Sequence, residues 1–203
     1  MAVHTMTDLI QMQSLPLEVK VRMSAQRVDR WVDEFGEEGV YTSFSGGKDS
    51  TVLKDIVENV CGYKKIPSVF VDVPTQYPEL KQFALSFDNV VVLKPKMSFM
   101  DVCEKYGFPL ISKEISESVH EAKSSLEKGK TDTYRIRQLF GQTNGRFDKS
   151  KWAFMIDAPF SVSHLCCNNL KKNPVKAYEK KTGRKGILGT MAEESVQRRT
   201  QWI

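Results

Sequence analysis

The chain has 203 residues and a mass of 23.2 kDa, enough for one ordinary domain that buries a core. Hydrophobic residues make up 40% and charged residues 27%, which is typical of a globular chain and argues against a disordered or low-complexity one. No apolar run approaches the ~18 residues that a membrane-spanning helix needs, and residues 1–13 lack the pattern of a secretory signal. We therefore expect a cytoplasmic protein with no membrane partner.

Positive charge is concentrated in the C-terminal part of the sequence. The formal net charge is +5, yet between His164 and Arg199 nine lysine and arginine residues stand against three glutamates. A local basic field favours a polyanionic ligand, such as a nucleotide or the backbone of a nucleic acid. The alternative is a lysine-rich helix face that is only solvated.

The first half of the chain alternates between helical and strand patterns. A helix is predicted from Pro16 to Gly36, because apolar residues recur there every three or four positions. Three short apolar runs then predict buried strands, with helices between them: strands at 40–44, 67–73 and 90–93, and helices at 50–57 and 79–87. This order predicts an α/β fold, with a three-layer Rossmann-like open sheet that is mostly parallel.

The second half is less regular. We expect helices at 98–106, 113–128 and 131–140, a short strand at 108–111 and an exposed loop at 141–150. A helix at 166–181 that Pro174 bends or restarts, a strand at 186–190 and a final helix at 192–199 complete the expected elements.

The segment from Ser43 to Ser50 joins the first predicted strand to its helix and is rich in small and polar residues. Gly46 and Gly47 leave room for a ligand to approach the backbone, and the helix start offers unpaired N–H groups with a positive dipole end. Ser45 and Ser50 add hydroxyl groups, Lys48 adds charge, and Asp49 is a candidate magnesium ligand. The pattern therefore predicts a phosphate-binding loop. A tight turn with helix caps is the alternative.

Ser45-Gly46-Gly47-Lys48-Asp49-Ser50 resembles the pyrophosphate (PP) loop of the adenine nucleotide alpha hydrolase superfamily. Three further segments resemble its phosphoadenosine phosphosulfate (PAPS) reductase branch: Val69–Glu79, His164–Cys167 with the lysines that follow, and Gly189–Ser195 with Arg198 and Arg199. The four segments occur in the family's order and cover most of the chain.

This resemblance implies an adenine nucleotide as ligand: PAPS, adenosine phosphosulfate or ATP. It implies that the loop binds phosphates and that Asp72 meets the adenosine, although Asp72 could equally accept backbone N–H bonds in a turn. The other residues that it implies in nucleotide binding are Ser43, Gly189, Glu194, Ser195, Arg198 and Arg199. The chain departs from the family at Val73-Pro74 and at Met191, where an arginine usually faces the substrate anion.

The paired cysteines decide the chemistry. Cys166 and Cys167 are candidate catalytic thiols for a sulfonucleotide reductase that uses a thioredoxin-like dithiol donor. No cysteine follows Cys167, so we expect no iron-sulfur cluster held by this chain alone. The thiol that usually attacks sulfur in such reductases lies in a later segment that this sequence lacks.

Three hypotheses follow from these motifs: a PAPS reductase-like enzyme that releases sulfite, an ATP pyrophosphatase-type enzyme that adenylates a substrate, and a nucleotide-binding subunit without turnover. A homo-oligomer and a nucleic-acid partner stay open. We expect an N-terminal helical segment at 1–37, a PP-loop nucleotide-binding α/β domain at 38–199 and a tail at 200–203, where a truncation stays open.

Overall fold

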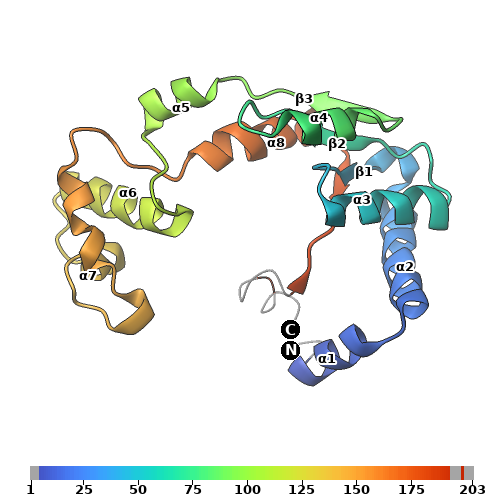
Figure 1. The fold of residues 1–203 in the computed structure, drawn as a ribbon, viewed down its shortest axis with the longest axis horizontal. Coiled ribbons are helices and arrows are strands. Elements are labelled where there is room, and N and C mark those ends of the chain that lie inside the picture. Colours follow the sequence, from blue (N-terminus) through green and yellow to red (C-terminus); the bar gives the residue numbers. More distant parts are fainter. Residues whose placement is uncertain (1–4, 193–197, 199–203) are drawn as a thin grey trace. The chain divides into compact units, whose positions relative to one another are not determined.

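The computed structural model of the protein describes residues 5–192 and Arg198 (Figure 1). Within them the chain divides into two units. Unit 1 takes the described residues of Met1–Asp72, Gln76–Leu93 and Lys176–Ile203, and unit 2 takes Val73–Thr75 and Lys94–Val175. The domain boundaries that the sequence suggested at residues 37 and 199 stay a prediction.

Unit 1 is an α/β sheet domain. Its strands are β1 (Val40–Ser43), β2 (Ser68–Val71), β3 (Val90–Leu93) and β4 (Lys185–Ile187), and its helices are α1 (Met6–Ser14), α2 (Leu17–Phe35), α3 (Lys48–Asp55) and α4 (Pro78–Leu85). The strand order is β3-β2-β1-β4, and every pairing among these strands is parallel. Thr42 lies opposite Ser68 and Val40 opposite Lys185. The predicted Rossmann-like α/β fold is thus confirmed.

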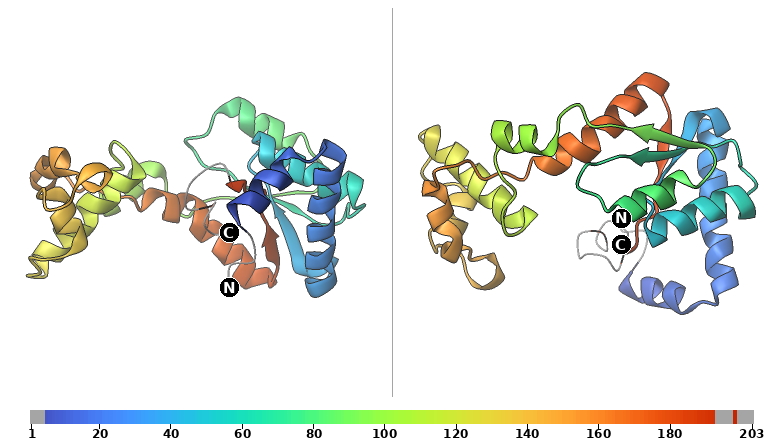
Figure 2. Two further views of the ribbon diagram at one scale, coloured as in Figure 1. Left: turned by 90° about the horizontal axis from the view of Figure 1, so that it is seen from below. Right: turned by 45° about the horizontal axis from the view of Figure 1, so that its top comes forward.

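Helices cover both faces of this sheet (Figure 2). α3 continues as a π-helical turn, η2 (Ile56–Val60). On one face of the sheet, Val40 packs with Val28 and Val32 of α2 and with Ile56 and Val57 of η2. Tyr41 points to the other face, because side chains alternate along a strand. There its hydroxyl donates to Glu179 Oε1 at 2.8 Å, and its ring meets Tyr178 edge-on, both in α8 (Asn173–Thr182).

Unit 2 is helical. It contains α5 (Phe99–Tyr106), α6 (Lys113–Glu127), α7 (Tyr134–Leu139) and the 3₁₀ turns η3 (Gly145–Phe147) and η4 (Ser150–Asp157). Its core is formed by one face of α6 with α7, Met155 and Val162. No residue of this core occurs in the core clusters of unit 1.

Several predicted elements need correction. The segment 108–111 is not a strand: Phe108 makes one isolated parallel bridge, to Val162. The last strand is Lys185–Ile187 rather than 186–190, because the chain leaves the sheet at Leu188. The predicted loop at 141–150 contains the turn η3 and a buried Lys149. The final helix at 192–199 lies almost entirely outside the described residues.

The helix that contains Pro174 changes its winding just before the proline. The chain is helical from Cys166 to Thr182, but Asn168–Lys172 forms a π-helical turn, η5, in which the Asn173 N–H donates to Asn168 O. A proline ring clashes with the carbonyl four residues earlier, and widening the preceding turn relieves that clash. Across the described residues, no helix combines the length and apolar character needed to span a bilayer.

Candidate functional site

The glycine loop lies at the point where the sheet changes direction. From β1 the chain passes through the loop into α3 and on to β2, whereas β4 lies on the opposite side of β1. In open α/β sheets, ligands bind at such a switch point, beyond the carboxyl ends of the two strands. Ser43 ends β1 beside Val69, and the Phe44 N–H donates to Val69 O at 2.9 Å, so the loop starts from a fixed position.

Two serines hold the loop in shape. The Ser45 N–H donates to Ser50 Oγ at 3.1 Å, and the Ser50 hydroxyl donates to Gly47 O at 2.9 Å. The Ser45 and Ser50 hydroxyls lie 3.0 Å apart, and the Gly47 N–H donates to Ser45 Oγ at 3.3 Å. These bonds close the loop on itself with Ser50 buried. Ser45 and Ser50 therefore shape the loop as well as adding hydroxyl groups to it.

The start of α3 is left open by this arrangement. Gly47 is the N-cap residue, and no side chain caps the helix. Among the described residues, none accepts a hydrogen bond from the backbone N–H groups of Lys48, Asp49 or Ser50. Unpaired N–H groups and the positive end of the helix dipole together attract an anion. Lys48 is exposed beside them.

Gly46 is required by both conformation and space. Its φ is +76°, and a Cβ atom there would lie 3.2 Å from Leu80 O and 3.4 Å from the Ala84 Cβ. The loop thus packs directly against α4. This close approach explains why a glycine stands at position 46.

The segment after β4 comes against the loop. A Cβ atom on Gly189 would lie 3.0 Å from Asp49 O and 3.4 Å from Leu53 Cβ, so the backbone at 189 touches the first turns of α3. Two segments that the sequence singled out, separated by about 140 residues, are therefore neighbours in unit 1.

A cavity of about 670 Å³ opens beside this contact. Asp49, Val52 and Leu53 line it from α3, the segment Gly186–Met191 from the end of the sheet, and Arg27 and Trp31 from α2. Arg27 is the one lysine or arginine among the described lining residues. The indole N–H of Trp31 is buried and has no hydrogen-bond partner among the described residues. The volume lies in the range of small-molecule sites.

Asp72 has a partner of its own. Its Oδ2 lies 2.8 Å from Lys81 Nζ of α4, and its backbone N–H donates to Leu93 O. Its carboxylate thus forms an ion pair within unit 1. Contact with a ribose stays a prediction.

The cysteine pair belongs to unit 2. Cys166 and Cys167 are half-buried and free, at the start of the helix that continues into α8. Burial first, and then the neighbouring Cys167, raises the pKa of the Cys166 thiol above its usual value. A raised pKa lowers the thiolate fraction at pH 7, which disfavours Cys166 as a nucleophile in this state. Cys103 is buried in α5.

Some residues that the resemblance implied in nucleotide binding lie outside the described part of the chain. Glu194, Ser195 and Arg199 are outside the described residues, and so is the tail at 200–203. Arg198 is described and exposed.

Asp49 fits the role of a magnesium ligand. Nucleotide sites commonly hold Mg²⁺ with one or two carboxylates together with the substrate phosphates and water. Asp49 stands in the first turn of α3 and lines the cavity. Over the described part of the chain, no three histidine, cysteine or acidic side chains gather into a metal site of their own.

The sequence reasoning missed Arg27, Trp31 and Lys81. Arg27 and Trp31 lie on α2, which the sequence identified only as a helix with a buried face, and polar residues on such a face carry no signature of their own. Lys81 lies nine residues after Asp72, but the pairing depends on where α4 folds back.

Comparisons with protein-family models, curated proteins and solved structures each find no match to this chain. Membership of the PAPS reductase family therefore stays a prediction from the motifs.

Proposed function

We propose that the protein binds an adenine nucleotide at the Ser45–Ser50 loop, as a PAPS reductase-like protein. The observation that carries the proposal is the uncapped start of α3 at the switch point of the sheet, in contact with Gly189. In this proposal the N–H groups of Lys48, Asp49 and Ser50 bind phosphate oxygens, and Lys48 adds a positive charge.

Arg27 has a specific part in this proposal. Met191 stands where the family usually has an arginine, and Met191 and Arg27 line the same cavity. An arginine on α2 would thus replace the missing charge from the other wall. A guanidinium group binds phosphate or sulfate oxygens in a two-pronged geometry, which suits a nucleotide with a terminal anionic group.

The proposed reaction is sulfonucleotide reduction. A thiolate from the Cys166–Cys167 pair attacks the sulfur atom of PAPS, the bond from sulfur to the bridging phosphate oxygen breaks, and adenosine 3′,5′-bisphosphate leaves. A dithiol donor of thioredoxin type then attacks the cysteine sulfur of the S-sulfonate, releases sulfite and becomes a disulfide once the cysteine is freed. Such a donor and four free cysteines favour a reducing compartment, so we place the protein in the cytoplasm.

Binding is tested by calorimetric titration with ATP, PAPS and adenosine 3′,5′-bisphosphate. Gly47 has an ordinary φ of −78°, so Gly47→Val is expected to fold while its side chain blocks the loop. Arg27→Gln is expected to weaken binding about tenfold, since it removes a charge-assisted contact. Arg30→Gln is the matched control, because Arg30 is exposed on the same helix and is not among the cavity's lining residues. Equal binding by all four proteins would contradict the proposal.

Turnover is tested separately, by sulfite release from PAPS in the presence of a dithiol. Cys166→Ser and Cys167→Ser are tested separately. The variant that lacks the attacking thiol is expected to release no sulfite. Nucleotide binding with no sulfite above these variants would leave a binding subunit as the function.

A second candidate is favoured by the position of Asp49 on the cavity wall. An ATP pyrophosphatase-type enzyme would use that carboxylate to hold Mg²⁺ against the phosphates. It predicts pyrophosphate release from ATP and magnesium that Asp49→Ala abolishes. Equal release by the two proteins would exclude this candidate.

A further inference from the structure

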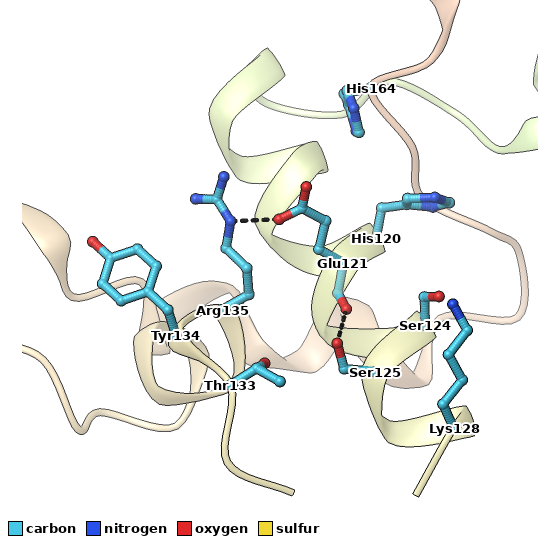
Figure 3. Close-up of a pocket in the computed structure, with 9 residues that line it drawn as sticks. All are labelled: His120, Glu121, Ser124, Ser125, Lys128, Thr133, Tyr134, Arg135 and His164. Carbon is cyan, nitrogen blue, oxygen red and sulfur yellow. Dashed lines mark hydrogen bonds and ion pairs between the residues drawn. The ribbon is translucent and has the colours of Figure 1, made fainter. Parts of the chain in front are cut away.

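Unit 2 contains a cavity of about 660 Å³ that has no part in the site described above. It lies between α6 and the start of α7, and His164 closes one side (Figure 3). Its lining residues are serines, histidines, a threonine, a tyrosine and charged residues.

On one side of this cavity, polar groups already have hydrogen-bond and ion-pair partners within the protein. The Arg135 guanidinium lies 2.7 Å from Glu121 and 3.2 Å from Glu117, and it also donates to Gln138 Oε1 at 3.2 Å. The Ser125 hydroxyl donates to Glu121 O at 2.7 Å. Arg135 is therefore already paired with two carboxylates and is not available to a ligand as a free cation.

The other side carries donors that have no such partners. His120 and Ser124 of α6 and Lys128, the C-cap residue of that helix, follow one another at intervals of four, so they lie on one side of it, as Figure 3 shows. The His164 ring lies 5.7 Å from the His120 ring, centroid to centroid. The described structure provides no ion-pair partner for Lys128 and no hydrogen-bond partner for the buried Nδ1 of His164.

Charge decides what kind of ligand suits this side. Unit 2 holds fourteen lysine and arginine residues against nine acidic ones, so its surplus of +5 equals that of the whole chain. The ammonium group of Lys128 disfavours a metal cation in this cavity, and its lining carboxylate, Glu121, is paired with Arg135. Ammonium, hydroxyl and imidazole N–H groups all donate hydrogen bonds, and a tetrahedral oxyanion accepts them.

We propose that His120, Ser124, Lys128 and His164 bind the phosphate or sulfate group of a small anionic molecule. The cavity is much larger than an inorganic ion, so the ligand carries an organic part as well. This binding is independent of the nucleotide loop, which belongs to unit 1.

Binding should take up protons. Burial lowers the pKa of His164; Glu117 and Glu121 oppose this shift, and His120 and Lys113 add to it. A bound anion stabilises the protonated imidazole and raises this pKa. Affinity should therefore increase as the pH falls from 8 to 6.

The test is NMR of the histidine rings in the full chain, titrated with sodium sulfate, whose charge is constant over this pH range. The chain has three histidines, and His120→Gln and His164→Gln assign the two signals of interest. Both signals are expected to shift to saturation, at lower sulfate concentration at pH 6 than at pH 8. Sodium chloride at equal ionic strength is the control, and equal shifts in the two salts would overturn the proposal.

Variants locate the site, and other anions define its ligand. Lys128→Gln is expected to weaken sulfate binding about tenfold, whereas Lys130→Gln, exposed two residues later, should not. If both variants bound sulfate equally weakly, the loss would come from the change in overall charge, and the proposal would be overturned. Gly47→Val should leave the shifts unchanged. If phenyl phosphate binds more tightly than inorganic phosphate, the inference that the ligand carries an organic part is supported. If it binds more weakly, that inference is overturned.

Discussion

At the scale of single residues, Gly46 combines two constraints that can be separated by experiment. Its φ is +76° and Leu80 O stands close to it, whereas Gly62 has a φ of +83° with nothing within 4 Å of an added Cβ. Gly62→Ala should cost about 1 kcal/mol through backbone strain alone. Gly46→Ala should cost about 1 kcal/mol more, because α4 must move. Urea unfolding measures both, and equal losses would show that the contact with α4 is unimportant.

Lys54 is a second residue whose environment sets its energy. It is 2% exposed, bonded to Glu58, Ser68 Oγ and Asp88 O, and it lies between the rings of Phe44 and Phe87. Lys54→Ala leaves these acceptors without their donor and should cost about 3 kcal/mol in the free energy of unfolding.

The matched control for Lys54 is Lys64→Ala, an exposed lysine whose loss should change the unfolding free energy by less than ~0.5 kcal/mol. Lys54→Met combined with Glu58→Met should recover part of the loss, because no charge is then left unpaired. If Lys54→Ala and Lys64→Ala unfold alike, the buried network is not stabilising.

At the scale of elements, the segment that follows η2 packs against α2 and makes the free energy of unfolding fall at alkaline pH. Burial first, and then Asp29, raises the pKa of Cys61 from 9.0 to about 11, and the same causes raise the pKa of Tyr63 from 10.0 to about 12. Both groups are neutral when protonated. Their contribution is therefore complete below pH 9 and is lost as the pH rises from 9 towards 12.

The expected result is a fall in the free energy of unfolding between pH 9 and pH 11, measured in urea at intervals of half a pH unit. Cys61→Ala removes one of the two groups and should make this fall smaller. A profile that does not differ between the two proteins would show that Cys61 does not contribute.

Elements with a strong periodic pattern could be predicted from the sequence, and those that depend on distant contacts could not. The apolar residues of α2 and the three valine-rich strands have the periods of a helix and of buried strands, and their limits agree with the structure within a few residues. Phe108 forms a bridge only because Val162, more than 50 residues away, lies beside it. The turns η3 and η4 also follow no period.

The candidate site divides in the same way. The loop from Ser45 to Ser50 could be predicted because glycines, hydroxyls and a helix start occur together in a short stretch. The resemblance assigned both Gly189 and the loop that contains Asp49 to nucleotide binding, but their contact was not predicted, because it depends on the pairing of β4 with β1. The side chains that α2 adds to the cavity could not be predicted, because their role depends on how α2 packs beside β4.

At the scale of the whole molecule, each unit has its own core, so damage to one should stay local. Leu139 is fully buried in unit 2 and Ile66 in unit 1. Replacing either by alanine should cost about 3 kcal/mol. Hydrogen exchange should then quicken in α6 and α7 for Leu139→Ala, and in β1 and β2 for Ile66→Ala. Faster exchange in both units from either variant would show that they unfold together.

The position of β4 in the chain also affects how the protein is made. β4 pairs with β1 but is synthesised about 90 residues after β3, with all but three residues of unit 2 encoded between them. At roughly 5–20 residues per second, the ribosome needs about 5–20 s to cover that interval. During this time one hydrogen-bonding edge of β1 has no strand beside it, and a chaperone that binds extended segments would find the nascent chain most receptive there.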